Sequence, residues 1–228
     1  MAEEFGMKII ARVRSDFSTK FGVPRQSALA EELTSRLVFE PEFRDENALR
    51  GIEQFSHLWL VWMFSENAEA GWSPTVRPPR LGGNTRVGVF ASRSPFRPNP
   101  IGLSCVRLIR VERDPKLGPV LVLAGADLMD GTPVFDVKPY IPYTDAHPDA
   151  APGYTAQTIR HELKVDFSAE MLRVVPEDKR NALISVLRQD PRPSYQNDPN
   201  RVYGFTFAGV EVRFRVEGDT LIVCAVFA

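Results

Sequence analysis

An arginine-only segment is the first feature of the chain whose residue types could do chemistry. Residues 70–111 contain seven arginines and no lysine, aspartate or glutamate. Arginine presents a planar fork of donors that binds carboxylates and phosphates in a bidentate manner. The segment is therefore a candidate anion-binding surface, and a solvated face paired with acids from elsewhere in the chain is the alternative. Its members are Arg77, Arg80, Arg86, Arg93, Arg97, Arg107 and Arg110.

A stiff loop is expected inside this segment, at residues 92–102 (SRSPFRPNPIG), where three prolines restrict the backbone. Asn99 and Gly102 permit unusual backbone angles. Arg93 and Arg97 on a rigid loop form a pre-organised polar platform, because rigidity lowers the cost of ordering on binding. The alternative is a structural turn that closes the corner of a barrel.

Three acids, Asp127, Asp130 and Asp136, follow near predicted strand ends. Carboxylates in such places act as general bases, metal ligands or acceptors for ribose hydroxyls. Turn chemistry is the alternative for Asp130, because Asp-Gly favours tight hairpins. Asp136 and Lys138 have the same parity on a strand, so pairing with each other is the alternative for them.

A second arginine-containing loop lies near the C-terminus, at residues 190–196 (DPRPSYQ), and residues 201–204 (RVYG) follow it. Arginine beside tyrosine on a proline-fixed loop suits stacking on bases and contact with phosphate. The alternative is a loop that packs Tyr195 into a small domain.

Most of the elements that must position these residues are strands. Residues 1–145 predict a mainly β structure with one short helix at 45–55, and closely spaced strands without alternating helices favour a single antiparallel β-barrel over a Rossmann sheet. Residues 146–160 read as a linker, and residues 161–228 as a small C-terminal α+β domain with a helix at 168–188 that breaks at Pro176. The expected strands cover 7–13, 36–40, 57–64, 86–91, 103–111, 120–126, 134–137, 202–207, 210–216 and 220–227.

Composition excludes several classes of protein. The net charge of −1 gives no global basic field, and two cysteines in 228 residues fit a reducing cytoplasm. No signal peptide is recognisable, and the longest apolar run is too short for a bilayer. Rossmann, Walker, zinc-protease and GxSxG motifs do not occur, and the three histidines are scattered. We therefore expect a cytoplasmic protein without a membrane span or a metal site.

Several long motifs in the chain resemble one known family. Residues 86–104 (RVGVFASRSPFRPNPIGLS) are similar to the signature of the TsaA-like, or TrmO, family. Residues 127–140 (DLMDGTPVFDVKPY) resemble its second signature, and Pro24, Arg25 and Gln26 a third. The two arginine-tyrosine segments near the C-terminus resemble the last part of bacterial TrmO. The likeness covers nearly the whole chain.

This resemblance implies an enzyme and a fold. Family members are S-adenosylmethionine-dependent tRNA methyltransferases that act on N6 of threonylcarbamoyl-adenosine at position 37 of threonine tRNA. The family fold is a single β-barrel. Members form homodimers, with the cofactor near the subunit interface. Residues 1–145 would then bind the cofactor and residues 161–228 the tRNA.

The resemblance also assigns a cofactor set. At Ser65 and Glu66 family members can carry His-Gln, so this chain departs from the pattern there. The full set is Pro24, Arg25, Gln26, Ser65, Glu66, Arg93, Leu103, Asp127, Leu128, Met129 and Asp130.

Roles for these residues follow as hypotheses. Arg25 or Arg93 suits the carboxylate of the methyl donor, and Glu66 or Asp127 suits its ribose hydroxyls. The catalytic base is unassigned, with Asp136 as a candidate from its place in the second signature. The tRNA is expected over the arginine-only segment and the small domain. Its predicted contacts are Arg77, Arg80, Arg192, Tyr195 and Arg201.

Two other classes of function remain as alternatives. A non-catalytic RNA-binding module would need only the arginines. A hydrolase dependent on a divalent metal would use Asp127, Asp130 and Asp136 as ligands.

Overall fold

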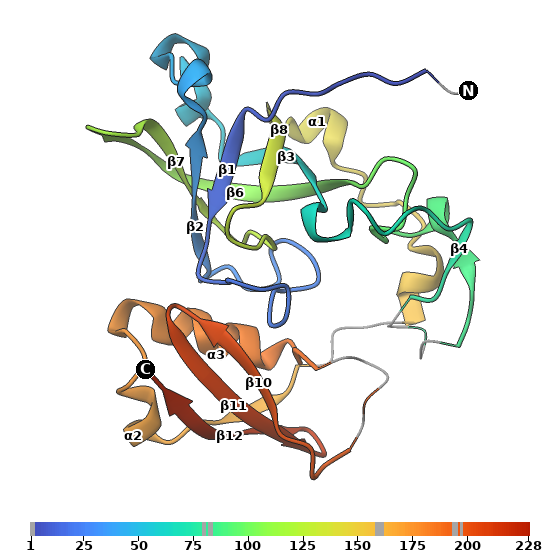
Figure 1. Ribbon diagram of the computed structural model, residues 1–228, viewed down its shortest axis with the longest axis vertical. Coiled ribbons are helices and arrows are strands. Elements are labelled where there is room, and N and C mark those ends of the chain that lie inside the picture. The colour runs from blue at the N-terminus through green and yellow to red at the C-terminus, as the bar shows by residue number, and fades with distance from the viewer. Residues whose placement is uncertain (1–2, 79–80, 82–83, 158–161, 193–195, 197) are drawn as a thin grey trace.

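The computed structural model describes residues 3–78, 81, 84–157, 162–192, 196 and 198–228. Six of its strands form one antiparallel sheet in the order β1-β2-β7-β6-β3-β8. Strand β8 pairs with both β3 and β1, so the sheet closes into a barrel (Figure 1). The prediction of a mainly β chain is confirmed. The strands are β1 (Ala11–Arg14), β2 (Thr34–Phe39), β3 (His57–Met63), β6 (Ile101–Asp114), β7 (Gly118–Ala124) and β8 (Pro133–Pro139).

The barrel encloses an apolar core, and β3 contributes to it through alternating burial. In β3, Leu58, Leu60 and Trp62 are buried, and the residues between them are partly exposed. Leu121 and Leu123 of β7 complete the same cluster. This period of two is what the pleat of a strand half-exposed to water requires.

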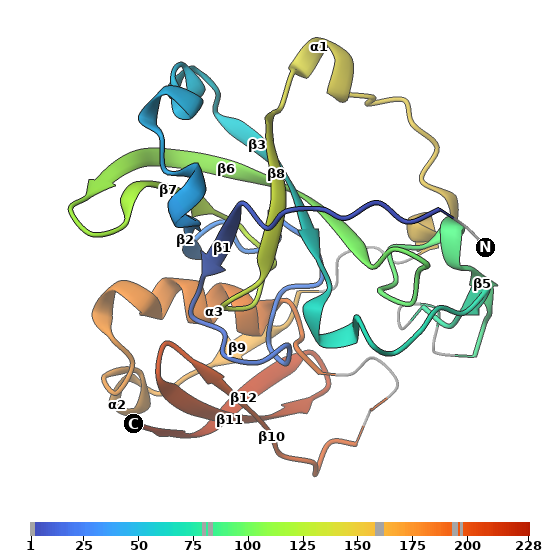
Figure 2. The ribbon, with the colours of Figure 1, turned by 45° about the horizontal axis from the view of Figure 1, so that its top comes forward.

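A second sheet lies in the C-terminal part of the chain, with the order β10-β11-β12-β9. Strand β9 runs parallel to β12, and the other pairs are antiparallel. Helix α3 runs along the side of this sheet that faces the barrel (Figures 1 and 2). The elements are β9 (Lys164–Asp166), α2 (Ala169–Leu172), α3 (Arg180–Arg188), β10 (Tyr203–Phe207), β11 (Val210–Glu217) and β12 (Thr220–Phe227).

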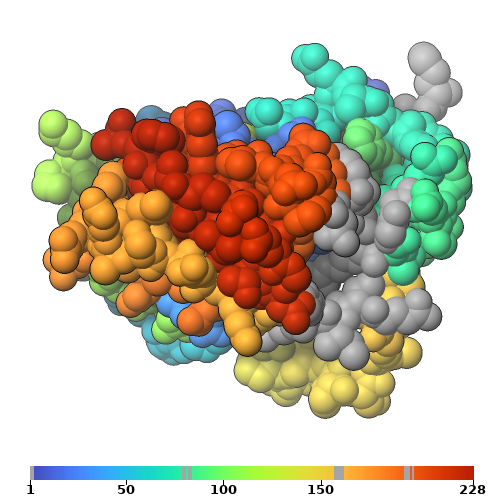
Figure 3. All heavy atoms as spheres, turned by 90° about the horizontal axis from the view of Figure 1, so that it is seen from below, coloured from blue at the N-terminus to red at the C-terminus, as the bar shows by residue number. Residues whose placement is uncertain are grey.

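The segment between β1 and β2, residues 15–33, joins the two halves of the molecule. Phe17 belongs to the C-terminal core, where its ring meets that of Phe207 at 5.2 Å between centroids. Gly22 has a φ of +91°, and a Cβ there would lie 2.4 Å from the ring of Phe205. This segment, called the bridging loop below, is therefore packed tightly against β10. Viewed from below, the C-terminal strands and helices cover much of the visible face (Figure 3).

Short helices account for the main differences from the sequence predictions. The single helix expected at 45–55 is wrong: two 3₁₀ turns, Glu46–Leu49 and Ile52–Gln54, occupy it, because Gly51 between them has a φ of +89°. The strand expected at 86–91 is paired only at β5 (Val87–Gly88), with β4 (Thr75–Val76), and a 3₁₀ turn at Val89–Ala91 follows.

Other short elements complete the chain. The helical pattern at 168–188 does break after α2, and Pro176 precedes a 3₁₀ turn that leads into α3. Further helical segments among the described residues are 3₁₀ turns at Pro41–Phe43, Ser65–Asn67 and Gly153–Gln157, and α1 (Pro142–Asp145); the turn after Pro176 covers Glu177–Lys179.

Candidate functional site

A cavity of about 420 Å³ opens beside one end of the barrel, where segments far apart in sequence meet. Its walls come from the bridging loop, the end of β3, the stiff loop at 92–102 and the turn after β7. All residues of the predicted cofactor set except Asp130 line it. The resemblance-based set is therefore one spatial cluster. Those residues are Pro24, Arg25, Gln26, Ser65, Glu66, Arg93, Leu103, Asp127, Leu128 and Met129.

Asp127 is the buried carboxylate of this cavity. Ser104 Oγ donates a hydrogen bond of 2.6 Å to its Oδ1, and Trp62 Nε1 donates to Ser104 Oγ at 3.0 Å. Burial raises the pKa of Asp127, while the Ser104 hydrogen bond and the charge of Arg93 act in the opposite direction. The cavity thus holds a carboxyl group whose loss of water is only partly compensated, which is a feature common at functional sites.

Trp62 and Ser104 are contributors that the sequence reasoning treated only as parts of strands. Trp62 lies opposite Gly102 in the β3–β6 ladder, and a Cβ on Gly102 would lie 2.2 Å from the indole. Gly102 is therefore required by close approach of the ring, and it does not adopt a positive φ. The available sequence signal is a serine two residues beyond this glycine in an otherwise apolar strand, and the structure shows this serine to be buried.

The stiff loop contributes in two ways. Arg93 Nη1 donates to Gln26 Oε1, which ties the loop to the bridging loop across the cavity. Arg97 also lines the cavity, and its Nη1 donates to the backbone carbonyls of Ser92 and Val89 at 2.6 and 3.1 Å. Arg97 therefore has a structural role in stabilising the loop. Arg93 and Arg97 also line the cavity, which is compatible with the hypothesis of a polar platform.

Arg25 links the cavity to the C-terminal domain. Its Nη2 donates to the backbone carbonyl of Arg192 at 2.8 Å. The Arg192 side chain is only 11% exposed and forms two hydrogen bonds, of 2.8 and 2.9 Å, with the carboxylate of Asp190. Of the predicted tRNA contacts, Arg192 is thus largely enclosed.

The other predicted tRNA contacts differ in position. Arg77 is exposed, and the guanidinium of Arg201 lies 5.5 Å from the ring centroid of Tyr203. Arg80 and Tyr195 lie outside the described residues.

Asp130 and Asp136 do not line the cavity. Asp130 accepts from the backbone N–H of Ser15 at 3.1 Å and pairs with Arg14 at 3.4 Å. Asp136 pairs with Lys138 at 2.8 Å, as their shared parity on a strand indicated. Among the described residues, no three His, Cys, Asp or Glu side chains gather in a way that could hold a metal ion. The three acids that the hydrolase alternative requires as metal ligands therefore have different partners and do not form one cluster.

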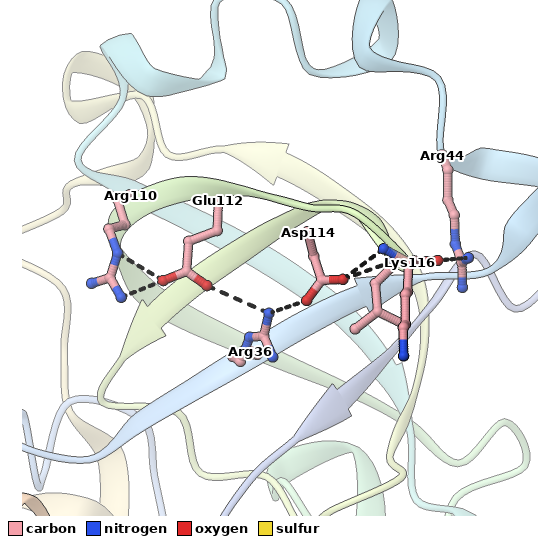
Figure 4. Close-up of polar contacts among 7 residues, drawn as sticks. Arg36, Arg44, Arg110, Glu112, Asp114 and Lys116 are labelled. Atoms are coloured by element: carbon pink, nitrogen blue, oxygen red, sulfur yellow. Dashed lines mark hydrogen bonds and ion pairs between the residues drawn. The ribbon is translucent and has the colours of Figure 1, made fainter.

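Part of the arginine-only segment is neutralised by acids, as Figure 4 shows on the outer side of the barrel. Arg110 pairs with Glu112, and Arg36 bridges Glu112 and Asp114 at 3.5 and 3.3 Å. The solvated, paired alternative therefore describes Arg110. Exposed pairs of this kind contribute little to stability.

No helix in the described parts of the chain combines the length and the apolar character that crossing a bilayer demands.

Comparison with known proteins gives consistent matches. The family model described as "tRNA-methyltransferase O N-terminal domain" matches residues 12–146, and the "TrmO C-terminal domain" model matches residues 160–228. A protein of Escherichia coli (strain K12) named "tRNA (adenine(37)-N6)-methyltransferase" is 42% identical over 220 residues, which is 93% of each chain. A protein of the same name from Eikenella corrodens is 49% identical over 76% of this chain and 98% of its own.

Solved structures agree with these matches. A crystal structure of TrmO superposes with a TM-score of 0.80 at 34% identity, over 99% of this chain and 100% of the other. A crystal structure of TrmO from Pseudomonas aeruginosa superposes with a TM-score of 0.79 at 33% identity, over 99% and 100% of the two chains.

Proposed function

The chain belongs to the TrmO family, and on that premise we propose that it is an S-adenosylmethionine-dependent methyltransferase acting on N6 of adenine 37 in tRNA. One observation carries the proposal. The residues that the family resemblance assigns to the cofactor line one cavity, although they come from four separate stretches of the sequence. Asp130 is the exception, because it accepts from the backbone N–H of Ser15 and pairs with Arg14.

The residues of the cavity fit such a cofactor. Its volume of about 420 Å³ lies in the range typical of small-molecule sites. Arg25 and Arg93 offer guanidinium groups for a carboxylate, and Asp127 and Glu66 offer acceptors for hydroxyl or ammonium groups. Trp62 and Leu103 supply apolar surface for a purine ring.

When bound, S-adenosylmethionine supplies a methyl group on a sulfonium, which is transferred by in-line displacement. The chain's own contribution is mainly orientation. Hydrogen bonds from Trp62 to Ser104 and from Ser104 to Asp127 fix the orientation of the Asp127 carboxylate. The hydrogen bond from Arg93 to Gln26 fixes the guanidinium of Arg93. The rigid loop and the bridging loop bring these groups together before binding, which reduces the ordering cost.

Asp136 is the candidate that the sequence offers for accepting the proton from N6. The ion pair with Lys138 and the place of Asp136 outside the cavity argue against that residue. We therefore expect Asp136→Asn to retain turnover close to that of the wild type. Loss of turnover with unchanged cofactor affinity would restore Asp136 as the acceptor.

We extend the proposal to the substrate and the division of labour. The barrel, residues 1–145, binds the cofactor, and the C-terminal domain, residues 161–228, contacts tRNA. The substrate is threonylcarbamoyl-adenosine at position 37 of threonine tRNA. The exposure of Arg77 and of Arg201 supports the tRNA surface, and the modified substrate rests on the family resemblance.

A cytoplasmic homodimer completes the proposal. Exposed aromatic side chains occur at Trp72, Phe90 and Phe96, and exposed apolar side chains of this size are candidates for a subunit interface. The two cysteines are free, as a reducing compartment requires.

Isothermal titration with S-adenosylmethionine, followed by nucleoside analysis of tRNA treated with the protein, tests the function. We expect micromolar binding and a methylated threonylcarbamoyl-adenosine. Threonine tRNA that lacks the threonylcarbamoyl group is the matched control and should remain unmethylated. Binding of tRNA without release of demethylated cofactor would favour the RNA-binding module, and loss of activity in a chelator would favour the metal-dependent hydrolase.

A further inference from the structure

A strained turn in the C-terminal domain holds Arg192 in place. Asp190 has a φ of +51°, in the left-handed region that asparagine and aspartate tolerate best among residues other than glycine. Its carboxylate accepts from Nε, from Nη2 and from the backbone N–H of Arg192. The planar fork of one side chain is thus matched to the carboxylate of the other, which orients the backbone of residue 192.

The backbone carbonyl oriented in this way faces the cofactor cavity from outside. It accepts from Arg25 Nη2 at 2.8 Å, and Arg25 lines the cavity. The next residue, Gln26, is bound by Arg93, which approaches from the opposite wall. A continuous set of polar contacts therefore runs from Asp190 to the cavity.

The apolar packing of the bridging loop follows the same path. Phe17, Ala30 and Leu33 of this loop are buried in the C-terminal core and not in the barrel core. The close approach of Gly22 to Phe205 leaves no space for a side chain. The wall of the cavity that carries Pro24, Arg25 and Gln26 is thus built on the C-terminal domain.

We infer that Arg192 is a positioning residue for the cofactor site: with Asp190 it holds Arg25 against the cavity, so the C-terminal domain sets the affinity for the methyl donor in the absence of tRNA. This inference rests on the proposed function. It assigns Arg192 to the cofactor site, where the sequence had predicted a direct contact with tRNA. An arginine whose side chain is 11% exposed and whose guanidinium is already bidentate with a carboxylate has little capacity left for phosphate.

The test measures cofactor affinity and tRNA affinity separately. Isothermal titration of Arg192→Ala with S-adenosylmethionine, without tRNA, should show binding weaker by about tenfold, as expected for loss of one charge-assisted hydrogen bond. The salt dependence of its tRNA binding should have the same slope as in the wild type.

A matched control comes from the same domain. Arg213 pairs with Glu211, also two residues away, at 2.8 Å, but both side chains are about half exposed and neither lines the cavity. Arg213→Ala should leave cofactor affinity unchanged. Asp190→Asn keeps the size and the tolerance of positive φ, so it tests the same contact in a protein that remains folded, and we expect weaker cofactor binding in the same direction.

The outcomes separate the inference from the proposed function. Unchanged cofactor affinity in Arg192→Ala and Asp190→Asn, with a smaller salt slope for tRNA, would overturn the positioning role and assign Arg192 to tRNA. Failure of the wild-type protein to bind S-adenosylmethionine would instead refute the proposed function.

Discussion

At the scale of single residues, the cavity depends on the packing of Trp62 against Gly102 and on the hydrogen bonds that lead from Trp62 to Asp127. Gly102 allows the indole of Trp62 to lie across β6, and Trp62 then donates to Ser104, which donates to Asp127. A buried carboxylate is thus oriented by neutral donors. Burial raises its pKa, which costs stability and leaves a group ready to interact with a ligand.

Gly102→Ala should disrupt this fit. The added Cβ would lie 2.2 Å from Trp62, so we expect a loss of about 1–3 kcal/mol in the free energy of unfolding and weaker cofactor binding. Urea denaturation and isothermal titration measure the two effects. Gly88→Ala is the control, because nothing lies within 4 Å of its Cβ and its φ is −60°. Equal stability of the two variants would contradict the role of Gly102.

Asp127→Asn should stabilise the free protein at neutral pH. The pKa of Asp127 is raised in the folded state, so its carboxyl is neutral in both states below the ordinary value of about 4. As the pH rises through the raised pKa, the wild type alone loses stability. A difference of about 1 kcal/mol would shift the melting temperature by about 2–4 °C.

Calorimetry from pH 4 to pH 8 checks this sign. The variant should match the wild type most closely at the acid end and exceed it increasingly toward neutrality. A difference that does not change with pH would show that Asp127 titrates normally. We also expect the variant to bind S-adenosylmethionine more weakly, a common exchange between stability and function.

At the scale of elements, the bridging loop is the decisive segment. It leaves the barrel after β1, contributes Phe17 and Leu33 to the C-terminal core and returns to β2. A loop with no regular structure is thereby fixed by packing on one side, and its other side forms a wall of the cavity.

Phe17→Ala should therefore destabilise both halves of the molecule. Removal of a fully buried phenylalanine costs about 3–5 kcal/mol. Because this loop packs in the C-terminal core and continues directly into β1 and β2 of the barrel, we expect one transition at a lower denaturant concentration, reported by both near-ultraviolet dichroism and tryptophan fluorescence. Phe5→Ala, at a side chain that is 86% exposed, is the control. Two separated transitions in the wild type would show that the halves unfold independently.

At the scale of the whole molecule, the net charge of −1 conceals an uneven distribution. Acids neutralise Arg36 and Arg110 on the outer side of the barrel, while Arg77 is exposed. The proposed tRNA surface is thus only part of the arginine-only segment.

Arg77→Ala combined with Arg80→Ala should weaken tRNA binding without affecting cofactor affinity. Loss of two phosphate contacts should reduce the slope of log K against log salt by about 1.4–1.8. Filter binding at several salt concentrations measures the slope. A slope identical to that of the wild type would place the tRNA elsewhere.

The proposed homodimer is tested with the exposed aromatic side chains. Trp72→Ser combined with Phe90→Ser should yield a monomer in sedimentation equilibrium, because both side chains are more than half exposed in the single chain. A sedimented mass of two chains in this variant would place the interface on another surface.

Local periodicity and proline were enough to predict the strand-rich character of the chain and the break at Pro176, and strand parity offered the pairing of Asp136 with Lys138 as one alternative. Through long motifs the sequence also indicated the family and the cofactor set. It did not show the two 3₁₀ turns at 46–54, since a left-handed glycine interrupts an otherwise helical pattern.

Which of these residues meet depends on the tertiary structure. Asp127 and Asp130 are three positions apart, yet one is buried in the cavity and the other pairs with Arg14. Arg192 and Arg25 are 167 positions apart and share a hydrogen bond. The physical reason is that strand register and long-range packing decide such contacts, and neither is encoded in local spacing.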